Sequence, residues 1–442
     1  MTTADTLAVR IAEAKSGWRP LTGSMVGLAV GLGSVPLYTN SVLFESLGSD
    51  YGWTTSSLTL VFLICNLLLA VVSPFAGRII DQVGSRMPAL VSSLVLAASY
   101  AVMALAPGSF TLYVVAQIVV YVAAAGSVAV GYARIVSGSF DRMRGIAMGI
   151  MNTGPALAAM ILPGVASSAL GSGGVRGAYV TLAAVVAVGG ILSYALVPGR
   201  ADAAHGPDGR VDAGGPGHPD HPDQPGHPGH ARDTDGPVST NAAARAGIDR
   251  TIVVMFVAFF FMALATIGLI EILFGLLLEI GTSQGEAVAL LGSLGAVMLV
   301  VRLCVGLLLD VLPVAWVAAG ALGLCAVGLA SLAVVGVEAA PVAVLSLGLA
   351  LGSETDILGV FVSRHSARER FGRVFGIGSL AYGLGVAVGP HLLETIHDAT
   401  GSADATIWTA VLALVASAAL FASTRPRRTR SRTLRSSTAA VI

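Results

Sequence analysis

Charged residues are scarce in this sequence, and their scarcity excludes a soluble globular protein. Only 11% of the 442 residues are Asp, Glu, Lys or Arg, whereas soluble domains carry about 25%. Hydrophobic residues make up 55% of the chain. A sequence of this composition buries its surface in lipid, so we expect an integral membrane protein.

Cysteine and catalytic motifs are also missing. The three cysteines, Cys65, Cys304 and Cys325, all lie in apolar stretches, which excludes a disulfide framework and zinc-site spacing. The sequence contains no phosphate-binding Walker loop and no His-Glu-x-x-His pair. It also offers no plausible Ser-His-Asp set. We therefore predict neither an enzyme nor an ATP-driven pump, and we expect no cofactor, no metal and no nucleic-acid partner.

Long apolar runs dominate the rest of the chain. Twelve are long enough to span a bilayer, since about 20 apolar residues suffice for one helix. They lie at 21–44, 56–80, 87–106, 110–134, 144–169, 176–197, 249–279, 284–309, 314–335, 340–362, 372–396 and 404–424. Basic residues gather in alternate loops and at both ends, with Arg176 as an exception. This bias predicts that both termini lie in the cytoplasm and that the protein sits in the cell membrane.

The spacing of the runs divides the chain into five parts. Residues 1–20 form a short cytoplasmic segment, 21–197 and 249–424 form two six-helix bundles, and 425–442 form a basic tail. The tail is expected to rest on anionic lipid headgroups. Residues 198–248 are rich in Gly, Pro, Asp and His without apolar periodicity, which predicts a disordered linker. Closely spaced histidines in that linker are a possible transition-metal ligand set, but we interpret them as compositional bias.

The two bundles carry a weak internal repeat. Gly77 and Asp81 correspond to Gly306 and Asp310, an offset of 229 positions, and Pro163 corresponds to Pro390 at an offset of 227. Repeated halves of this kind place a substrate site between them. The fold class predicted is therefore an all-α membrane protein with twelve transmembrane helices in two homologous bundles.

The stretch Gly77–Arg86 stands out between the second and third runs. It reads Gly-Arg-Ile-Ile-Asp-Gln-Val-Gly-Ser-Arg and resembles the signature loop of the major facilitator superfamily. We interpret it, with its weaker second copy, as a gating motif at the cytoplasmic face. The residues assigned to this motif are Gly77, Asp81, Gly84, Arg86, Gly306 and Asp310.

Other stretches resemble one group within that superfamily, the bacterial relatives of monocarboxylate transporters, which includes oxalate–formate exchangers. The resemblance rests on Tyr51-Gly52-Trp53-Thr54, on 140–154, on Arg302 with Gly306, on 352–356 and on 363–373. It implies the major facilitator fold and transport of a small carboxylate. The chain departs from the group at Met298, where some members have an acidic residue, and in lacking a lysine in the eleventh run.

Charges within the apolar runs are the informative site candidates. An arginine in a span costs about 2.5–3.5 kcal/mol on insertion, so such residues usually face a cavity or a partner. We interpret Arg302 as a clamp for the substrate anion, with an internal ion pair as the alternative. Glu354 and Asp356 are candidates for carrying the coupling proton, and Glu271 is a third that we expect to be partly solvated near the outer half.

Hydrogen-bonding side chains within the spans complete the predicted substrate site. Pro36 is expected to bend the first run, and polar residues follow it. Each such residue is also explained by helix–helix packing. The predicted substrate-binding set is Arg302, Tyr38, Asn40, Asn66, Tyr121, Asn152 and Tyr382.

We therefore predict a monomeric secondary transporter of a small organic anion, coupled to a proton or to a counter-anion. The first alternative is an exporter of amphipathic drugs or metabolites, which a large apolar cavity would favour. The alternative of another class is a non-transporting membrane sensor, which would need a folded cytoplasmic domain.

Overall fold

The protein is a bundle of helices that run along one common direction. The computed structural model describes residues 3–123, 129–140, 143–197, 250–365 and 371–424. No strand occurs within these ranges. The predicted linker 198–248, its histidines and the basic tail 425–442 lie outside them.

The first half of the chain contributes eight helical segments. They are α1 (Thr3–Ala29), α2 (Val35–Tyr51), α3 (Thr55–Val83), α4 (Arg86–Leu105), α5 (Phe110–Ala123), α6 (Ala129–Ser139), α7 (Arg144–Met151) and α8 (Thr153–Leu196).

The second half contributes six long helices and one short 3₁₀ turn. They are α11 (Arg250–Glu279), α12 (Gln284–Val311), α13 (Val314–Val335), η2 (Val337–Ala339), α14 (Ala340–His365), α15 (Phe371–Thr400) and α16 (Ala403–Ser423).

Two of the predicted passages are not single uninterrupted helices, and a third is described in two segments. The first is broken between α1 and α2, where Gly31 and Gly33 precede Pro36 in the first turn of α2. The fifth comprises α7 and the first part of α8, which meet at Asn152. The fourth is described as α5 and α6, on either side of residues 124–128, which lie outside the described ranges. The sixth is the rest of α8, after Gly174, whose φ of 60° and ψ of −163° are accessible to glycine but strained for other residues. Grouped in this way, the helices make the twelve predicted passages.

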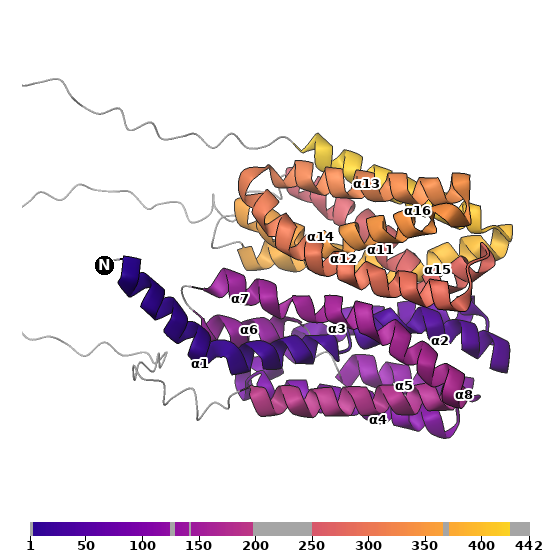
Figure 1. Ribbon diagram of the computed structural model, residues 1–442, viewed down its shortest axis with the longest axis horizontal. Helices are drawn as coiled ribbons and strands as arrows, with labels where there is room; N and C mark the ends of the chain where they lie inside the picture. Colours follow the sequence, from indigo (N-terminus) through magenta and orange to yellow (C-terminus); the bar gives the residue numbers. More distant parts are fainter. Residues whose placement is uncertain (1–2, 124–128, 141–142, 198–249, 366–370, 425–442) are drawn as a thin grey trace, which may run out of the picture.

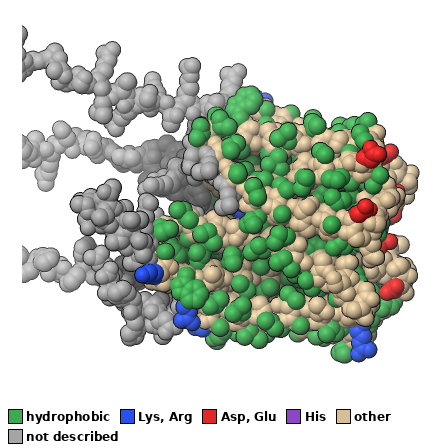
Figure 2. Space-filling model, viewed as in Figure 1, with side chains coloured by type: hydrophobic (Ala, Val, Ile, Leu, Met, Phe, Trp, Pro, Cys, Tyr) green, Lys and Arg blue, Asp and Glu red, His purple; other side chains and the backbone are tan. Residues whose placement is uncertain are grey.

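The surface between the two ends of the bundle is apolar, as a lipid environment requires. Within the described residues, nine stretches are long and apolar enough to cross a membrane, and α5 is a shorter apolar helix. Large aliphatic side chains in the middle of their helices, such as Leu412 and Val188, are 68% and 66% exposed. Figure 2 shows apolar side chains along the flanks and acidic side chains gathered at the right-hand end. We call this end, where α2, α11 and α15 finish, the distal end.

The two halves of the chain lie side by side (Figure 1). They contact each other through α8 with α12, α3 with α15, and α2 with α11. At the α8–α12 contact the backbones approach closely, because a Cβ on Gly295 would collide with the Met160 nitrogen and would meet the Ala156 oxygen at 2.7 Å. Small residues permit such approach between membrane helices. The candidate site lies in the space between the two halves.

The motif at the other end of the bundle differs from the predicted loop. Helix α3 continues through Gly77 and Asp81 to Val83, so only Gly84 and Ser85 separate it from α4. Gly84 has a φ of 88°, which makes the tight turn possible. The predicted runs left residues 81–86 between the helices, and α3 extends three residues further, to Val83.

Arg86 opens α4 and is held by the end of α8. Its Nε donates to the Tyr194 carbonyl at 3.3 Å, and its guanidinium lies 4.1 Å from the centre of the Tyr194 ring. The side chains of Asp81 and Asp310, and the surroundings of Gly77 and Gly306, lie outside the described part of the structure.

Candidate functional site

A central cavity of about 280 Å³ lies between the halves, beside the break between α1 and α2. Helices α3, α5 and α8 line it from the first half, and α11 and α15 line it from the second. Most of the wall is apolar. The polar side chains in it are Ser34, Asn66, Tyr121 and Tyr382. Three residues of the predicted binding set are thus brought together from three helices.

The polar side chains of this cavity are held by their neighbours. Asn66 donates from Nδ2 to the Phe62 carbonyl at 2.9 Å, and the Tyr121 ring packs edge-on against the Phe62 ring. Ser34 donates to the Leu28 carbonyl at 2.6 Å across the break in the first passage. The Gly-rich turn before Pro36 was the sequence signal for Ser34, which the prediction passed over in favour of the residues after Pro36.

A buried carboxylate lies next to the cavity wall. Glu354 on α14 is 3% exposed, and Tyr382 donates to its Oε2 at 2.6 Å. The Thr266 hydroxyl of α11 lies 2.5 Å from its Oε1 and 2.9 Å from the Met262 carbonyl. Three helices of the second half therefore meet at one carboxylate, and the tyrosine that donates to it, Tyr382, also lines the cavity.

Arg302 on α12 is close to this carboxylate without forming a direct pair. It interacts electrostatically with Glu354 and with Asp356, which is half-buried two residues further along α14. Among the described residues, no carboxylate oxygen lies within 4.0 Å of its guanidinium nitrogens. Its Nε is buried and has no hydrogen-bond partner in the described structure. Arg302 does not line the central cavity.

Tyr38 on α2 connects the first half to α12, the helix that carries Arg302. It is buried, lies within electrostatic reach of Arg302, and its hydroxyl is 3.9 Å from the Met298 sulfur one turn earlier on α12. Asn152, which was also placed in the binding set, lies at the α7–α8 junction. It lines neither the central cavity nor the second cavity at the distal end.

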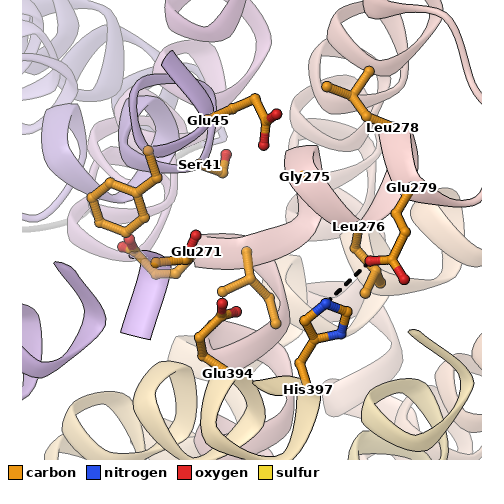
Figure 3. A pocket seen from close by; sticks show the side chains of 12 residues that line it. Ser41, Glu45, Glu271, Gly275, Leu276, Leu278, Glu279, Glu394 and His397 are labelled. Carbon is orange, nitrogen blue, oxygen red and sulfur yellow. Dashed lines mark ion pairs between the residues drawn. The ribbon is translucent and has the colours of Figure 1, made fainter. Parts of the chain in front are cut away.

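A second cavity, of about 400 Å³, lies at the distal end (Figure 3). Its wall contains Glu45 from α2, Glu271 and Glu279 from α11, and Glu394 and His397 from α15. His397 Nε2 and Glu279 Oε2 form an ion pair at 3.2 Å. We call this space the distal cavity.

The prediction for Glu271 was wrong in one respect. The residue was expected to be partly solvated, but it is 0% exposed because α2 packs over it. The other carboxylates of the distal cavity were not identified from the sequence. Their signal was the near absence of basic residues from the loops at this end.

Two polar contacts between the halves separate the cavities. Leu37 and Ile267 line the central cavity, and one helical turn later Ser41 and Glu271 line the distal one. At this level Asn40 donates from Nδ2 to Glu271 Oε2 at 3.0 Å.

The second contact joins Thr59 of α3 to His391 of α15, with 3.4 Å between Oγ1 and Nδ1. We call the Asn40–Glu271 and Thr59–His391 contacts together the distal partition. Both join residues of the first half to residues of the second, so the partition breaks if the halves separate at this end.

Residues 25–390 match the sequence profile of the Major Facilitator Superfamily. The chain belongs to this superfamily. Members of this superfamily are membrane transporters and not enzymes, so this chain is a multi-pass membrane transporter. No individual curated protein matches the chain. For this major facilitator transporter, the class of activity therefore comes from the family, and the substrate has to be argued from the cavities.

Proposed function

We propose that this transporter carries a small organic anion, a mono- or dicarboxylate, through the central cavity by alternating access. The observation that supports the proposal is the half-buried Arg302, whose Nε atom is buried and has no hydrogen-bond partner in the described structure. A guanidinium presents a planar set of donors that matches a carboxylate, and a buried donor without a partner is costly. An entering carboxylate would satisfy it.

The size of the central cavity favours a small solute. About 280 Å³ corresponds to roughly nine water volumes of about 30 Å³ each. Pockets for drug-sized ligands usually measure about 300–1,000 Å³. The apolar wall favours the alternative, export of amphipathic compounds, and it also suits the carbon chain of a small acid.

Arg302 has to gain access to the cavity during the transport cycle. Tyr382 lines the cavity, bonds to Glu354 and lies within electrostatic reach of Arg302. We propose that substrate entry displaces the Tyr382 side chain and that the substrate carboxylate then pairs with Arg302. In the absence of substrate, Glu354 offsets the positive charge at longer range.

The hydrogen bonds around Glu354 support a role in carrying a proton. A hydroxyl has one proton to donate, and Thr266 is within bonding distance of both Glu354 and the Met262 carbonyl. If Glu354 is protonated, it donates to Thr266, which donates to Met262. If Glu354 is ionised, the Thr266 proton turns to it. Rotation of one hydroxyl therefore accommodates both states, which favours Glu354 over Asp356 as the proton carrier.

The proposal is tested by uptake of labelled formate, oxalate, lactate and succinate into proteoliposomes that contain purified transporter. We expect at least one acid to be accumulated. Arg302→Gln should reduce its uptake about 30-fold or more, because loss of one partner of a buried charge pair costs about 2–5 kcal/mol. Arg176→Gln, at an exposed arginine of α8, is the matched control and should transport normally.

Glu354→Gln separates the proton role from the binding role. We expect this variant to exchange the acid across the membrane but to lose stimulation by an imposed proton gradient. If Arg302→Gln transports every acid at the wild-type rate, Arg302 is not the anion clamp. If no acid is carried and an amphipathic dye is expelled, the exporter alternative replaces the proposal.

A further inference from the structure

The distal cavity holds more carboxyl groups than a passage for anions requires. Its wall carries four carboxyl groups, and His397 is the basic side chain among its lining residues. The contact of His397 Nε2 with Glu279 Oε2 occupies one of these carboxyl groups. Glu45, Glu271 and Glu394 remain, from three different helices.

Glu271 supplies an acceptor that is buried and unused. Its side chain is 0% exposed, its Oε2 accepts from Asn40, and its Oε1 has no hydrogen-bond partner in the described structure. Glu271 nevertheless lines the distal cavity. A buried polar atom without a partner costs free energy, so a donor placed in this cavity would be stabilised there.

The other two carboxylates close around the same space, as Figure 3 shows. Glu394 is 7% exposed, so it also lies deep in the wall. Glu45 is exposed at the rim, and its Oε2 lies against Gly275 on α11. The cavity is therefore deepest at Glu271 and Glu394 and opens past Glu45.

We propose that the distal cavity is a binding site for an organic ammonium ion. An ammonium group carries three N–H donors and a positive charge, which fits Glu271 Oε1 together with Glu394. The apolar side chains of Phe44, Ile272 and Leu276 line the same cavity and would receive a short carbon chain. The aromatic ring of Phe44 adds an attractive surface for a cation.

Two observations favour an organic cation over a coordinated metal ion. Among the described residues, no group of three His, Cys, Asp or Glu is close enough to hold a metal. The volume of about 400 Å³ corresponds to roughly thirteen water volumes of about 30 Å³, far more than one ion fills. A ligand of several heavy atoms uses the separated carboxylates, which a single metal ion does not.

The site is connected to the transport machinery through Glu271. One oxygen of this residue forms the distal partition with Asn40, and the other is offered to the ammonium ion. A cation bound there would lie about one helical turn from the central cavity. Its charge differs from that of the proposed substrate, so the two cavities would select different ligands.

The test uses purified full-length transporter and 1,4-diaminobutane as the probe. The thermal unfolding midpoint is measured against diamine concentration at constant ionic strength, with sodium chloride and tetramethylammonium chloride as matched salts. We expect a saturable rise with the diamine, a smaller one with methylammonium and none with sodium or tetramethylammonium, which have no N–H donor.

Variants locate the site. Glu271→Gln and Glu394→Gln should each weaken the apparent affinity for the diamine about tenfold or more, while Glu338→Gln, an exposed acid in η2, should leave it unchanged. An equal rise with sodium chloride, or an undiminished response in both Glu271→Gln and Glu394→Gln, overturns the proposal. If Glu271→Gln does not fold, Glu394→Gln and Glu45→Gln decide the matter alone.

Discussion

Replacing Asn40 with alanine should open the distal side of the transporter. Asn40 is 4% exposed and donates to Glu271 across the boundary between the halves. Its loss leaves Glu271, already without a partner at Oε1, with no described hydrogen bond at either oxygen. Separation of the halves would give both oxygens access to water. The substitution therefore destabilises the closed arrangement and spares the open one.

The magnitude follows from the cost of leaving a buried acceptor unsatisfied, which is about 1–3 kcal/mol. A tenfold change in an equilibrium corresponds to about 1.4 kcal/mol, so the ratio of open to closed transporter should rise about 5- to 150-fold. The Thr59–His391 contact, at 3.4 Å, is the longer of the two. Thr59→Val should therefore raise the ratio by less.

The assay reads access to the central cavity from the distal side. Leu37 lines that cavity, and Leu37→Cys is introduced after Cys65, Cys304 and Cys325 are replaced by serine or alanine. In the topology predicted from the basic residues the distal end faces outward, so a membrane-impermeant maleimide is added from the outside of intact cells. We expect its labelling rate at position 37 to increase with Asn40→Ala, roughly in proportion to the open fraction while that fraction is small.

The control and the refuting result are both direct. Cells carrying Asn40→Ala without the cysteine at position 37 should show no labelling, which sets the background. A labelling rate that is the same with and without Asn40→Ala would show that the Asn40–Glu271 bond does not hold the partition closed.

Two further predictions concern packing and the buried carboxylate. Gly295→Ala should lower the free energy of unfolding by about 1–3 kcal/mol, because its Cβ would displace backbone atoms of α8. Gly323→Ala should raise it by up to about 1 kcal/mol, because a Cβ there meets nothing within 4 Å. Equal melting temperatures for the two variants would refute this reasoning. Tyr382→Phe removes the 2.6 Å bond to Glu354 and should cost about 1.5–3 kcal/mol when that carboxylate is ionised but about 0.5–1.5 kcal/mol when it is protonated. The loss in unfolding midpoint should accordingly be larger at pH 9 than at pH 5, and an equal loss would mean that Glu354 keeps one protonation state across that range.

The passages through the membrane were predictable from the sequence because they are set locally. Without water, a spanning segment must satisfy its own backbone hydrogen bonds, so about 20 consecutive apolar residues predict a helix without knowledge of its neighbours. The bend before Pro36 was likewise visible in the sequence, and the structure places the break at residues 30–34. The family resemblance was predicted from short motifs and is confirmed at the level of the superfamily.

The partners of the buried polar groups were decided only by the tertiary structure. Asn40 and Glu271 are 231 positions apart, and Thr59 and His391 are 332 apart. The sequence does not show such pairs, because a helix in lipid is apolar on the face toward the bilayer and on the face toward its neighbours. Hydropathy then gives no period that reveals which side of α11 faces α2. For that reason Glu271 was expected to be partly solvated, and only the packing of the two halves showed that it is buried beside the distal cavity.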